Sequence, residues 1–296
     1  MLCKSSLLET IHNAMSDKFG KIAAPQWLQD LSGGDINRAA LIGNGNSKWF
    51  LKYNQAAADG MFAAEALALD EIGQQNCIKV PAPVVFGSDG DTAWLLLEYL
   101  ELSAHGPDAL LGEQLAALHS VKFQHFGWKR DNFIGSAAQI NKQSNDWCGF
   151  WRDARLKPQL VMAEAAGFGA QLADKGHRLL ESMSHFMKNH RPVASLLHGD
   201  LWSGNKAFSK NGIPVIFDPA SYYGDRETDI AMTELFGGFG PEFYSAYNAH
   251  TPLPADYHLR RDLYNLYHML NHLNLFGAGY LSRCENIIDH LLAQVR

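Results

Sequence analysis

The hydrophobic pattern of the chain changes near residue 98, and this change most constrains the fold. Before it, short apolar runs alternate with turn sequences such as Gly43-Asn44-Gly45. These runs predict an opening helix, three strands, a second helix and two further strands. The expected ranges are 7–19 for the first helix, 27–31, 36–42 and 48–53 for the three strands, 61–72 for the second helix, and 83–87 and 92–97 for the last strands.

After residue 98, apolar residues recur mostly at helical spacing, with one interruption at residues 195–220. We therefore predict an α+β protein with two lobes. Residues 1–98 would form a small antiparallel-sheet lobe with one main helix, and residues 99–296 a larger helical lobe. The helices expected in the second lobe cover residues 107–120, 146–156, 158–168, 170–189, 226–236, 241–248, 257–275 and 280–295.

Composition excludes several classes of protein. The 296 residues include 25 Lys and Arg against 31 Asp and Glu, so no basic excess is present to bind nucleic acid. The four cysteines form no Cys-x-x-Cys pair, which argues against a zinc site built on paired thiolates. No apolar stretch approaches the length of a membrane span, and the first residues show no apolar signal segment. We expect a cytoplasmic protein without a nucleic-acid or membrane partner.

The most informative segment is His198-Gly-Asp200-Leu-Trp-Ser-Gly-Asn205, followed by Asp218 after a predicted turn. Phosphoryl transfer requires an oriented acceptor hydroxyl and neutralised phosphate charge. In the kinase arrangement an aspartate faces the hydroxyl, and an asparagine five residues later and an aspartate on the next hairpin hold Mg²⁺. Asp200, Asn205 and Asp218 have this spacing, and their hard oxygen atoms suit Mg²⁺. An isolated pattern of this kind more often only satisfies turn backbones.

The first lobe offers groups that could hold a nucleotide. Lys52 lies on the third predicted strand, and Glu65 lies on the next helix in an apolar setting that calls for a charged partner. A strand lysine paired with a helix glutamate holds the α- and β-phosphates in kinases. Further nucleotide-binding candidates, chosen by position alone, are Gly33, Gly34 and Asn37 in a turn and Glu98, Tyr99 and Leu100 at the hinge.

These motifs closely resemble the fructosamine kinase (ketosamine-3-kinase) family of the protein-kinase-like superfamily, and the resemblance covers nearly the whole chain. Its specific blocks are HGDLWSGN at 198–205 and YYGDRETDIAM at 222–232. The resemblance implies a bilobal protein-kinase-like fold. It also implies ATP- and Mg²⁺-dependent phosphorylation of the 3-hydroxyl of ketosamines, free or on glycated proteins, as a deglycation repair. The oligomeric state stays open between monomer and dimer.

Carried over by position, the resemblance implies that Asp200 is the catalytic base and that Asn205 and Asp218 bind the metal. Lys52 and Glu65 would hold the phosphates. Two alternatives remain open: a kinase of another hydroxylated amine, similar to aminoglycoside or choline kinases, and a non-catalytic pseudokinase that binds nucleotide. The second is disfavoured because a pure binding module has no need of Asp200.

Other polar and aromatic residues have weaker assignments. Candidate substrate contacts are Trp202, His198, Asp131 and Arg155. The aromatic-rich segment 123–151 fits a sugar pocket and a plain core equally well. Asp229 resembles the residue that braces the catalytic loop. His268 and His272 lie one helical turn apart without the glutamate of a zinc-protease motif, so we expect them in a packed helix.

Overall fold

The computed structural model describes residues 4–31, 36–45, 47–54, 60–90 and 92–295. The chain divides into two compact units. Unit 1 comprises Met1–Pro107 and Ala207–Asp218, and unit 2 comprises Asp108–Lys206 and Pro219–Arg296. The predicted domains, divided after residue 98, differ from these units in where they place residues 99–107 and 207–218.

Unit 1 is built on an antiparallel five-stranded sheet in the order β1-β2-β3-β5-β4. Each strand pairs with the strand beside it in that order, and the strand between β3 and β4 is the last of the five in sequence. The strands lie close to the predicted ranges and extend one or two residues further at several ends. Their bounds are β1 (Gln26–Leu31), β2 (Arg38–Gly43), β3 (Lys48–Asn54), β4 (Pro83–Asp89) and β5 (Thr92–Glu98).

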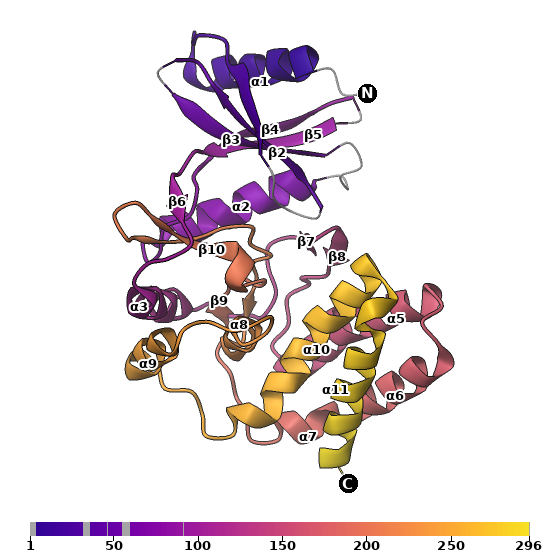
Figure 1. Cartoon of the computed structure of the whole chain (residues 1–296). Helices are drawn as coiled ribbons and strands as arrows, with labels where there is room; N and C mark the ends of the chain where they lie inside the picture. The colour runs from indigo at the N-terminus through magenta and orange to yellow at the C-terminus, as the bar shows by residue number, and fades with distance from the viewer. Residues whose placement is uncertain (1–3, 32–35, 46, 55–59, 91, 296) are drawn as a thin grey trace. The chain divides into compact units, whose positions relative to one another are not determined.

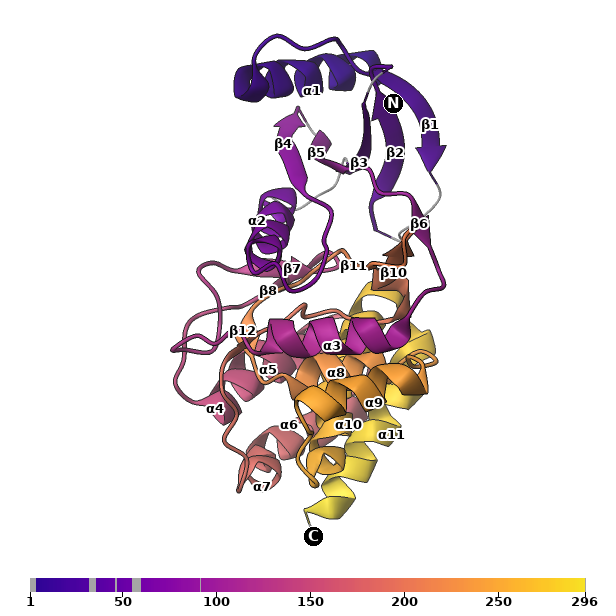
Figure 2. The same cartoon turned by 90° about the vertical axis from the view of Figure 1, so that its left-hand side faces the viewer.

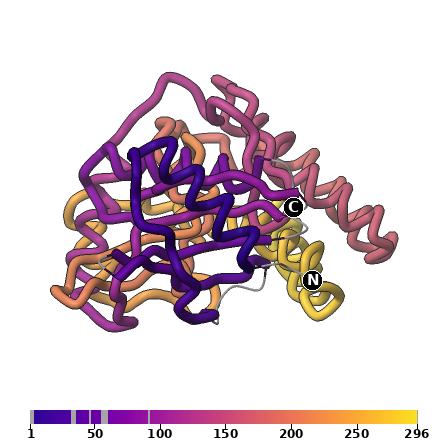
Figure 3. The backbone as a smooth tube through the Cα atoms, turned by 90° about the horizontal axis from the view of Figure 1, so that it is seen from above, coloured from indigo at the N-terminus to yellow at the C-terminus, as the bar shows by residue number. Residues whose placement is uncertain are grey.

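Two helices cover the two faces of this sheet (Figure 1), and α1 lies over it in the view from above (Figure 3). Strand alternation decides which side chains each face receives. Helix α1 (Lys4–Phe19) packs Leu7, Ile11 and Met15 against residues that include Leu51 and Tyr53 of β3. Lys52, between those two residues, points to the other face, where its ammonium meets α2 (Met61–Gln74). The alternation of β3 therefore sets the direction of Lys52.

A small sheet joins residues 207–218 to unit 1. Strand β6 (Leu102–Ser103) pairs with β10 (Lys206–Ser209), which pairs in turn with β11 (Pro214–Ile216). A bridge between Lys79 and Val215 ties β11 to the segment before β4. Asp218 is consequently part of the unit that contains Lys52.

Unit 2 is mainly helical, as the sequence predicts (Figure 2). Every residue of helix α10 from Leu263 to Asn271 is buried, so the helix is surrounded by protein on all sides over that length. Helix α3 packs against α9, and α10 packs against α5, α8 and α11. The helices are α3 (Asp108–His119), α4 (Trp147–Trp151), α5 (Lys157–Ala165), α6 (Ala170–Glu181), α7 (Met183–Met187), α8 (Glu227–Thr233), α9 (Pro241–His250), α10 (Tyr257–Phe276) and α11 (Leu281–Gln294).

Short elements interrupt the predicted helices of unit 2. The expected helix over 146–156 continues from α4 into a π-helix, η1 (Arg152–Leu156), and the one over 170–189 breaks at Ser182. Two small strand pairs were not predicted: the hairpin of β7 (Asn132–Ile134) with β8 (Ala137–Gln139), and the pairing of β9 (Ser195–Leu196) with the distant β12 (Tyr223–Gly224). Strands this short carry too few alternating residues for a sequence pattern to detect them.

Most aromatic residues of the segment 123–151 form core. Trp147 and Trp151 are buried, and both rings lie against the ring of Tyr264. Phe133 is half-buried, and Phe123 has 45% of its surface exposed. The structure thus favours the core interpretation of this segment over a sugar pocket.

Arg155 is fully buried, although the sequence analysis assigns it a substrate contact. Its guanidinium lies 4.0 Å from the ring centre of Tyr222 and donates to the Ile140 carbonyl and to Asn141 Oδ1. Cation–π contact and backbone acceptors compensate for the lost hydration of the charge. In this position Arg155 holds the hairpin β7–β8 against the helices and offers no exposed surface to a substrate.

Within the described residues, no helix is both long and apolar enough to cross a membrane. Cys77, Cys148 and Cys284 are free thiols.

Candidate active site

The loop from His198 to Asn205 follows β9 and ends in a short 3₁₀ turn, η2 (Ser203–Asn205). Gly199 adopts φ +85°, and a Cβ there would lie 2.2 Å from the Ala220 carbonyl oxygen. Only glycine fits this approach without displacing the backbone. The glycine of His-Gly-Asp is therefore required by the turn that presents Asp200.

Asp229 of α8 stabilises this turn by hydrogen bonds to its backbone. Its carboxylate accepts hydrogen bonds from the backbone N–H of His198 (2.7 Å) and of Gly199 (2.8 Å), and lies 3.2 Å from His119 Nε2. Burial alone would raise the pKa of Asp229, but these donors, with His119 foremost, lower it. Asp229 is thus an ionised, buried anchor, in the position that the resemblance gives to the bracing residue.

Asp200 and Asn205 contact each other within the loop. Asn205 Nδ2 donates to the Asp200 carbonyl oxygen at 2.8 Å and approaches Asp200 Oδ2 at 3.4 Å. The Asp200 side chain is 22% exposed, whereas Asn205 is buried. The amide nitrogen of Asn205 is therefore used within the loop itself.

In unit 1, Lys52, Glu65 and Asp218 form a charged cluster. Lys52 Nζ lies 2.6 Å from Glu65 Oε1 and 3.0 Å from Asp218 Oδ1. The side chains of Lys52 and Glu65 are nearly buried, at 8% and 10% exposure, whereas that of Asp218 is 44% exposed. The sequence predicts the first contact, and the structure adds Asp218 as a second partner.

The pKa values of this cluster follow from its burial and charge balance. Desolvation would lower the pKa of Lys52, but attraction to Asp218 and Glu65 outweighs it and raises the pKa. Burial raises the pKa of Glu65, and Lys52 opposes that rise. Lys52 is therefore a permanent cation whose half-exposed partner, Asp218, leaves the cluster accessible from one side.

Asp218 has a left-handed backbone conformation, with φ +59°. Non-glycine residues in this region carry strain, and they concentrate at functional sites. The conformation occurs at the last residue of unit 1, directly before Pro219. It is an independent sign that the placement of the Asp218 carboxylate matters.

The remaining nucleotide candidates differ in how well the structure locates them. Gly33 and Gly34 lie outside the described residues. Asn37 Oδ1 accepts a hydrogen bond from Asn54 Nδ2 at 3.0 Å. At the hinge, the Glu98 carboxylate pairs with Lys79 at 2.7 Å, so only backbone groups of Glu98 remain for a base. Tyr99 and Leu100 are half-buried.

The substrate candidates are spread over unit 2. His198 is buried, and its Nδ1 accepts from the Asp200 N–H at 3.3 Å, so it supports the loop from inside. Asp131 is exposed, and its carboxylate accepts from the Asn141 N–H at 2.7 Å. Trp202 is half-buried, with its ring 6.0 Å from that of Phe236. Of the four candidates, Trp202 alone is both part of the loop and partly exposed.

The sequence analysis overlooked one residue beside Asp200. His268 of α10 lies with Nδ1 3.7 Å from Asp200 Oδ1. The predicted packed helix is correct for its leucines, but α10 is buried all round and so also directs polar residues inward. One sequence feature could have pointed to His268. The leucines of this helix already form an apolar stripe, so the packing of the helix does not account for the histidine.

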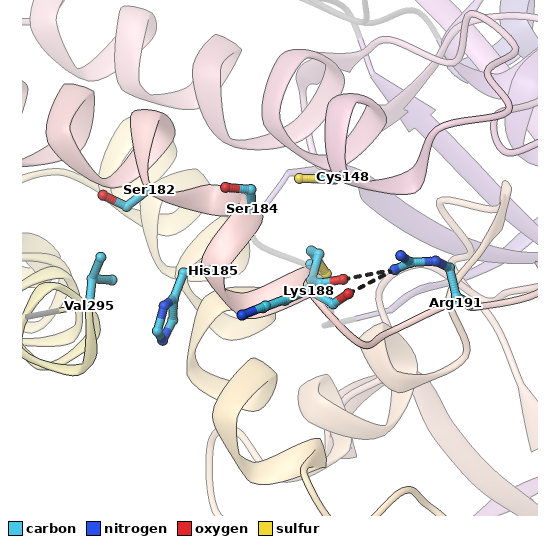
Figure 4. A pocket seen from close by; sticks show the side chains of 8 residues that line it. Cys148, Ser182, Ser184, His185, Lys188, Arg191 and Val295 are labelled. Atoms are coloured by element: carbon cyan, nitrogen blue, oxygen red, sulfur yellow. Dashed lines mark hydrogen bonds between the residues drawn. The ribbon is translucent and has the colours of Figure 1, made fainter.

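A separate pocket of about 540 Å³ lies in unit 2 near α7 and the end of α11 (Figure 4). His185, Lys188 and Arg191 give its lining a basic character, and Arg191 donates to the carbonyls of Met187 and Lys188. The pocket includes no residue of the catalytic loop, and we assign it no part in the site.

Comparison with known proteins shows which family this chain resembles. A model of the family described as fructosamine kinase matches residues 7–294. A relative from Synechocystis, named a probable ketoamine kinase, is 40% identical over 96% of each chain. A protein-ribulosamine 3-kinase from Arabidopsis thaliana is 40% identical, over 94% of this chain and 86% of its own.

Solved structures agree with the fold. A protein from Haemophilus somnus named as a fructosamine-3-kinase superposes with a TM-score of 0.88 at 29% identity, over 95% of this chain and 96% of its own. An aminoglycoside phosphotransferase in complex with AMP-PNP and hygromycin B has a TM-score of 0.63 at 17% identity, over 95% of this chain and 98% of its own, which shows a shared fold alone. The family match, the relatives and the loop geometry agree, and the chain belongs to the fructosamine kinase family.

Proposed function

We propose that this protein transfers the γ-phosphoryl group of ATP to the 3-hydroxyl of ketosamines, the sugar adducts of amines. The observation that carries the proposal is the braced loop that presents Asp200 beside Asn205, in a chain 40% identical over its length to a named ketoamine kinase. Fructosamine, ribulosamine and erythrulosamine groups, free or on proteins, are the substrates that we propose. The biological role would then be repair of glycated amines.

Asp200 orients the acceptor hydroxyl and accepts its proton. In the reaction, the acceptor oxygen forms a bond to the γ-phosphorus while the bond from that phosphorus to the bridging oxygen of ADP breaks. An aspartate is a weak base near neutral pH, so the proton moves late, after most of the phosphoryl transfer. The main contribution of Asp200 is therefore to hold the hydroxyl in line.

Lys52 supplies fixed positive charge for the nucleotide phosphates. Glu65 holds the ammonium in place from within unit 1, and the raised pKa keeps Lys52 protonated. The backbone of Glu98, Tyr99 and Leu100 is the part of unit 1 that we assign to the adenine. Gly33, Gly34 and Asn37 belong to the segment that we assign to the phosphates.

Asn205 and Asp218 are the residues that would hold Mg²⁺. An amide oxygen and a strained, half-exposed carboxylate are hard donors of the kind that Mg²⁺ shares with phosphates. When bound, the ion neutralises charge on the phosphates during transfer. Each of the two donors is thus of a kind that fits the metal that the family implies.

Two other functions are distinguishable from this proposal. A kinase acting on a different hydroxylated amine would use the same loop, and a pseudokinase would bind ATP without transfer. Asp200 disfavours the pseudokinase, since nucleotide binding alone has no need of a carboxylate placed to meet a hydroxyl.

The test is phosphate transfer from ATP and Mg²⁺ to ribuloselysine, erythruloselysine, fructoselysine, choline and an aminoglycoside. Transfer to one or more ketosamines, and not to choline or the aminoglycoside, supports the proposal and ranks the sugars. Transfer only to another amine contradicts the substrate. Nucleotide binding with no transfer to any acceptor contradicts the enzymatic role.

A further inference from the structure

His268 occupies an unusual place in the interior of unit 2. The residue is 3% exposed, and its Nδ1 atom, although buried, forms no hydrogen bond with any described residue. A buried polar atom without a partner costs free energy and calls for an explanation. Asp200 Oδ1 lies 3.7 Å from this atom.

The two oxygen atoms of the Asp200 carboxylate face different neighbours. Oδ2 lies 3.4 Å from Asn205 Nδ2, on the loop itself. Oδ1 faces His268 Nδ1, on a helix that is distant in sequence. A carboxylate with a neighbour at each oxygen, on separate elements, would be restricted in rotation once both contacts were hydrogen bonds, and a hydroxyl bound to it would then be oriented by it.

The protonation of His268 can be inferred from its surroundings. Burial, together with the charges of His272 and Arg155, lowers the pKa of His268 to about 3, against the opposing effect of Asp229. The imidazole is therefore neutral near pH 7 and carries one N–H. A lone pair on Nδ1 would repel the Asp200 carboxylate, so the proton belongs on Nδ1, where it faces Oδ1.

We propose that His268 is a positioning residue for the transfer, whose Nδ1–H holds Asp200 Oδ1 while Asp200 orients the acceptor hydroxyl. The 3.7 Å separation is longer than a hydrogen bond, and catalytic hydrogen bonds often shorten when the acceptor binds. This role rests on the proposed function, because it serves the hydroxyl-facing aspartate. It adds a residue that acts only through Asp200.

The first experiment compares three variants in steady-state kinetics with the ketosamine that the wild-type protein uses best. His268→Leu keeps apolar packing but removes the donor, and we expect kcat to fall about 10- to 100-fold with the KM for ATP unchanged. His268→Asn places an amide N–H near the position of Nδ1 and should retain activity within about 3-fold. Met269→Leu, a buried neighbour on the same helix, is the control for repacking and should change kcat less than 2-fold.

The melting temperature separates positioning from packing. Leucine removes a buried atom without a partner, so His268→Leu should melt at the wild-type temperature or above it. Normal kcat in His268→Leu, or a loss of activity matched by a loss of folded protein in both His268→Leu and His268→Asn, would overturn the proposal.

A second measurement does not depend on activity. The ¹⁵N chemical shifts of the His268 ring, assigned by their absence in His268→Leu, report which nitrogen carries the proton. We expect the Nδ1–H form at pH 7, and the Nε2–H form would overturn the proposal even in a protein that phosphorylates ketosamines. Observation of the Nδ1–H form in a protein that transfers no phosphate would refute the proposed function alone.

Discussion

Lys52 and Asp200 are the centres of two regions that hold their charged side chains in different ways. Around Lys52, opposite charges meet directly, with Glu65 at 2.6 Å and Asp218 at 3.0 Å. Around Asp200, the anchoring charge of Asp229 meets N–H groups of the backbone and of a histidine. The first region balances charge with charge, and the second holds a backbone turn with a buried carboxylate.

This difference has a functional consequence. An ion pair can exchange one partner for a ligand of the same charge, so the Lys52 cluster is suited to receive phosphates in exchange for contact with the exposed Asp218. A turn held by a buried carboxylate cannot exchange its acceptor without unfolding locally. The loop is therefore suited to keep Asp200 in one place while the acceptor comes and goes.

The largest effect should come from Asp200→Ala, which removes the hydroxyl-facing group and leaves the loop anchor intact. We expect kcat to fall by about 10³- to 10⁴-fold, with ATP affinity changed less than about 3-fold. Turnover and nucleotide binding, the latter by calorimetry, check this expectation. Loss of ATP binding in the variant would make Asp200 a structural residue and would remove the distinction between the two regions.

Asp229→Ala should mainly cost stability. It leaves the buried N–H groups of His198 and Gly199 without acceptors, and we expect the free energy of unfolding to fall by about 3 kcal/mol. Urea unfolding measures the loss. Asp289→Ala, which breaks the partly exposed pair with Lys175, is the matched control and should cost less than about 1 kcal/mol. Equal losses in the free energy of unfolding of the two variants would show that buried Asp229 stabilises the protein no more than the exposed ion pair does.

Lys52→Met tests the exchangeable cluster. We expect kcat/KM for ATP to fall about 100-fold because the fixed cation is lost. The variant should also lose stability, since Glu65 is left buried without its partner. Adding Glu65→Gln should recover stability but not activity. Recovery of activity in the double variant would show that Lys52 does not act on the nucleotide.

The smallest effect concerns pH. The pKa values of His119 and His268 are lowered in the folded protein, chiefly by burial. Below about pH 6.5 these histidines bind protons in the unfolded chain but not in the folded one, so stability is present above that pH and declines as the pH falls. Between pH 7.5 and 5.5 we expect His268 to contribute a loss of about 1 kcal/mol, and His119 a loss in the same direction. In His268→Leu the decline should be smaller by about that amount, and an unchanged decline would show that His268 is protonated in the fold.

The sequence predicted those parts of the molecule that have a local signal. The strands of unit 1 alternate in hydrophobicity, and the long helices of unit 2 repeat at helical spacing, so the α+β class and most elements are confirmed. The pairing of Lys52 with Glu65 was also predictable, because a charge among alanines needs a partner nearby.

Contacts between distant segments were harder to predict. Asp218 meets Lys52 across 166 positions, and His268 meets Asp200 through the packing of α10, so neither contact leaves a trace in local pattern. For Arg155 the sequence analysis predicted a substrate contact, whereas the structure buries the residue. An arginine is rarely buried without a carboxylate, and no local pattern indicates that aromatic rings and carbonyl groups surround this one.

The most direct test of the proposed activity is the position of the phosphate on the product. The protein is incubated with ATP, Mg²⁺ and ribuloselysine or fructoselysine, and the product is analysed by ³¹P–¹H correlation NMR. We expect phosphorus to couple to the proton on C3 of the sugar, and this signal to be absent with Asp200→Ala. Phosphate on any other hydroxyl, or an equal yield from Asp200→Ala, would contradict transfer to the 3-hydroxyl by this loop.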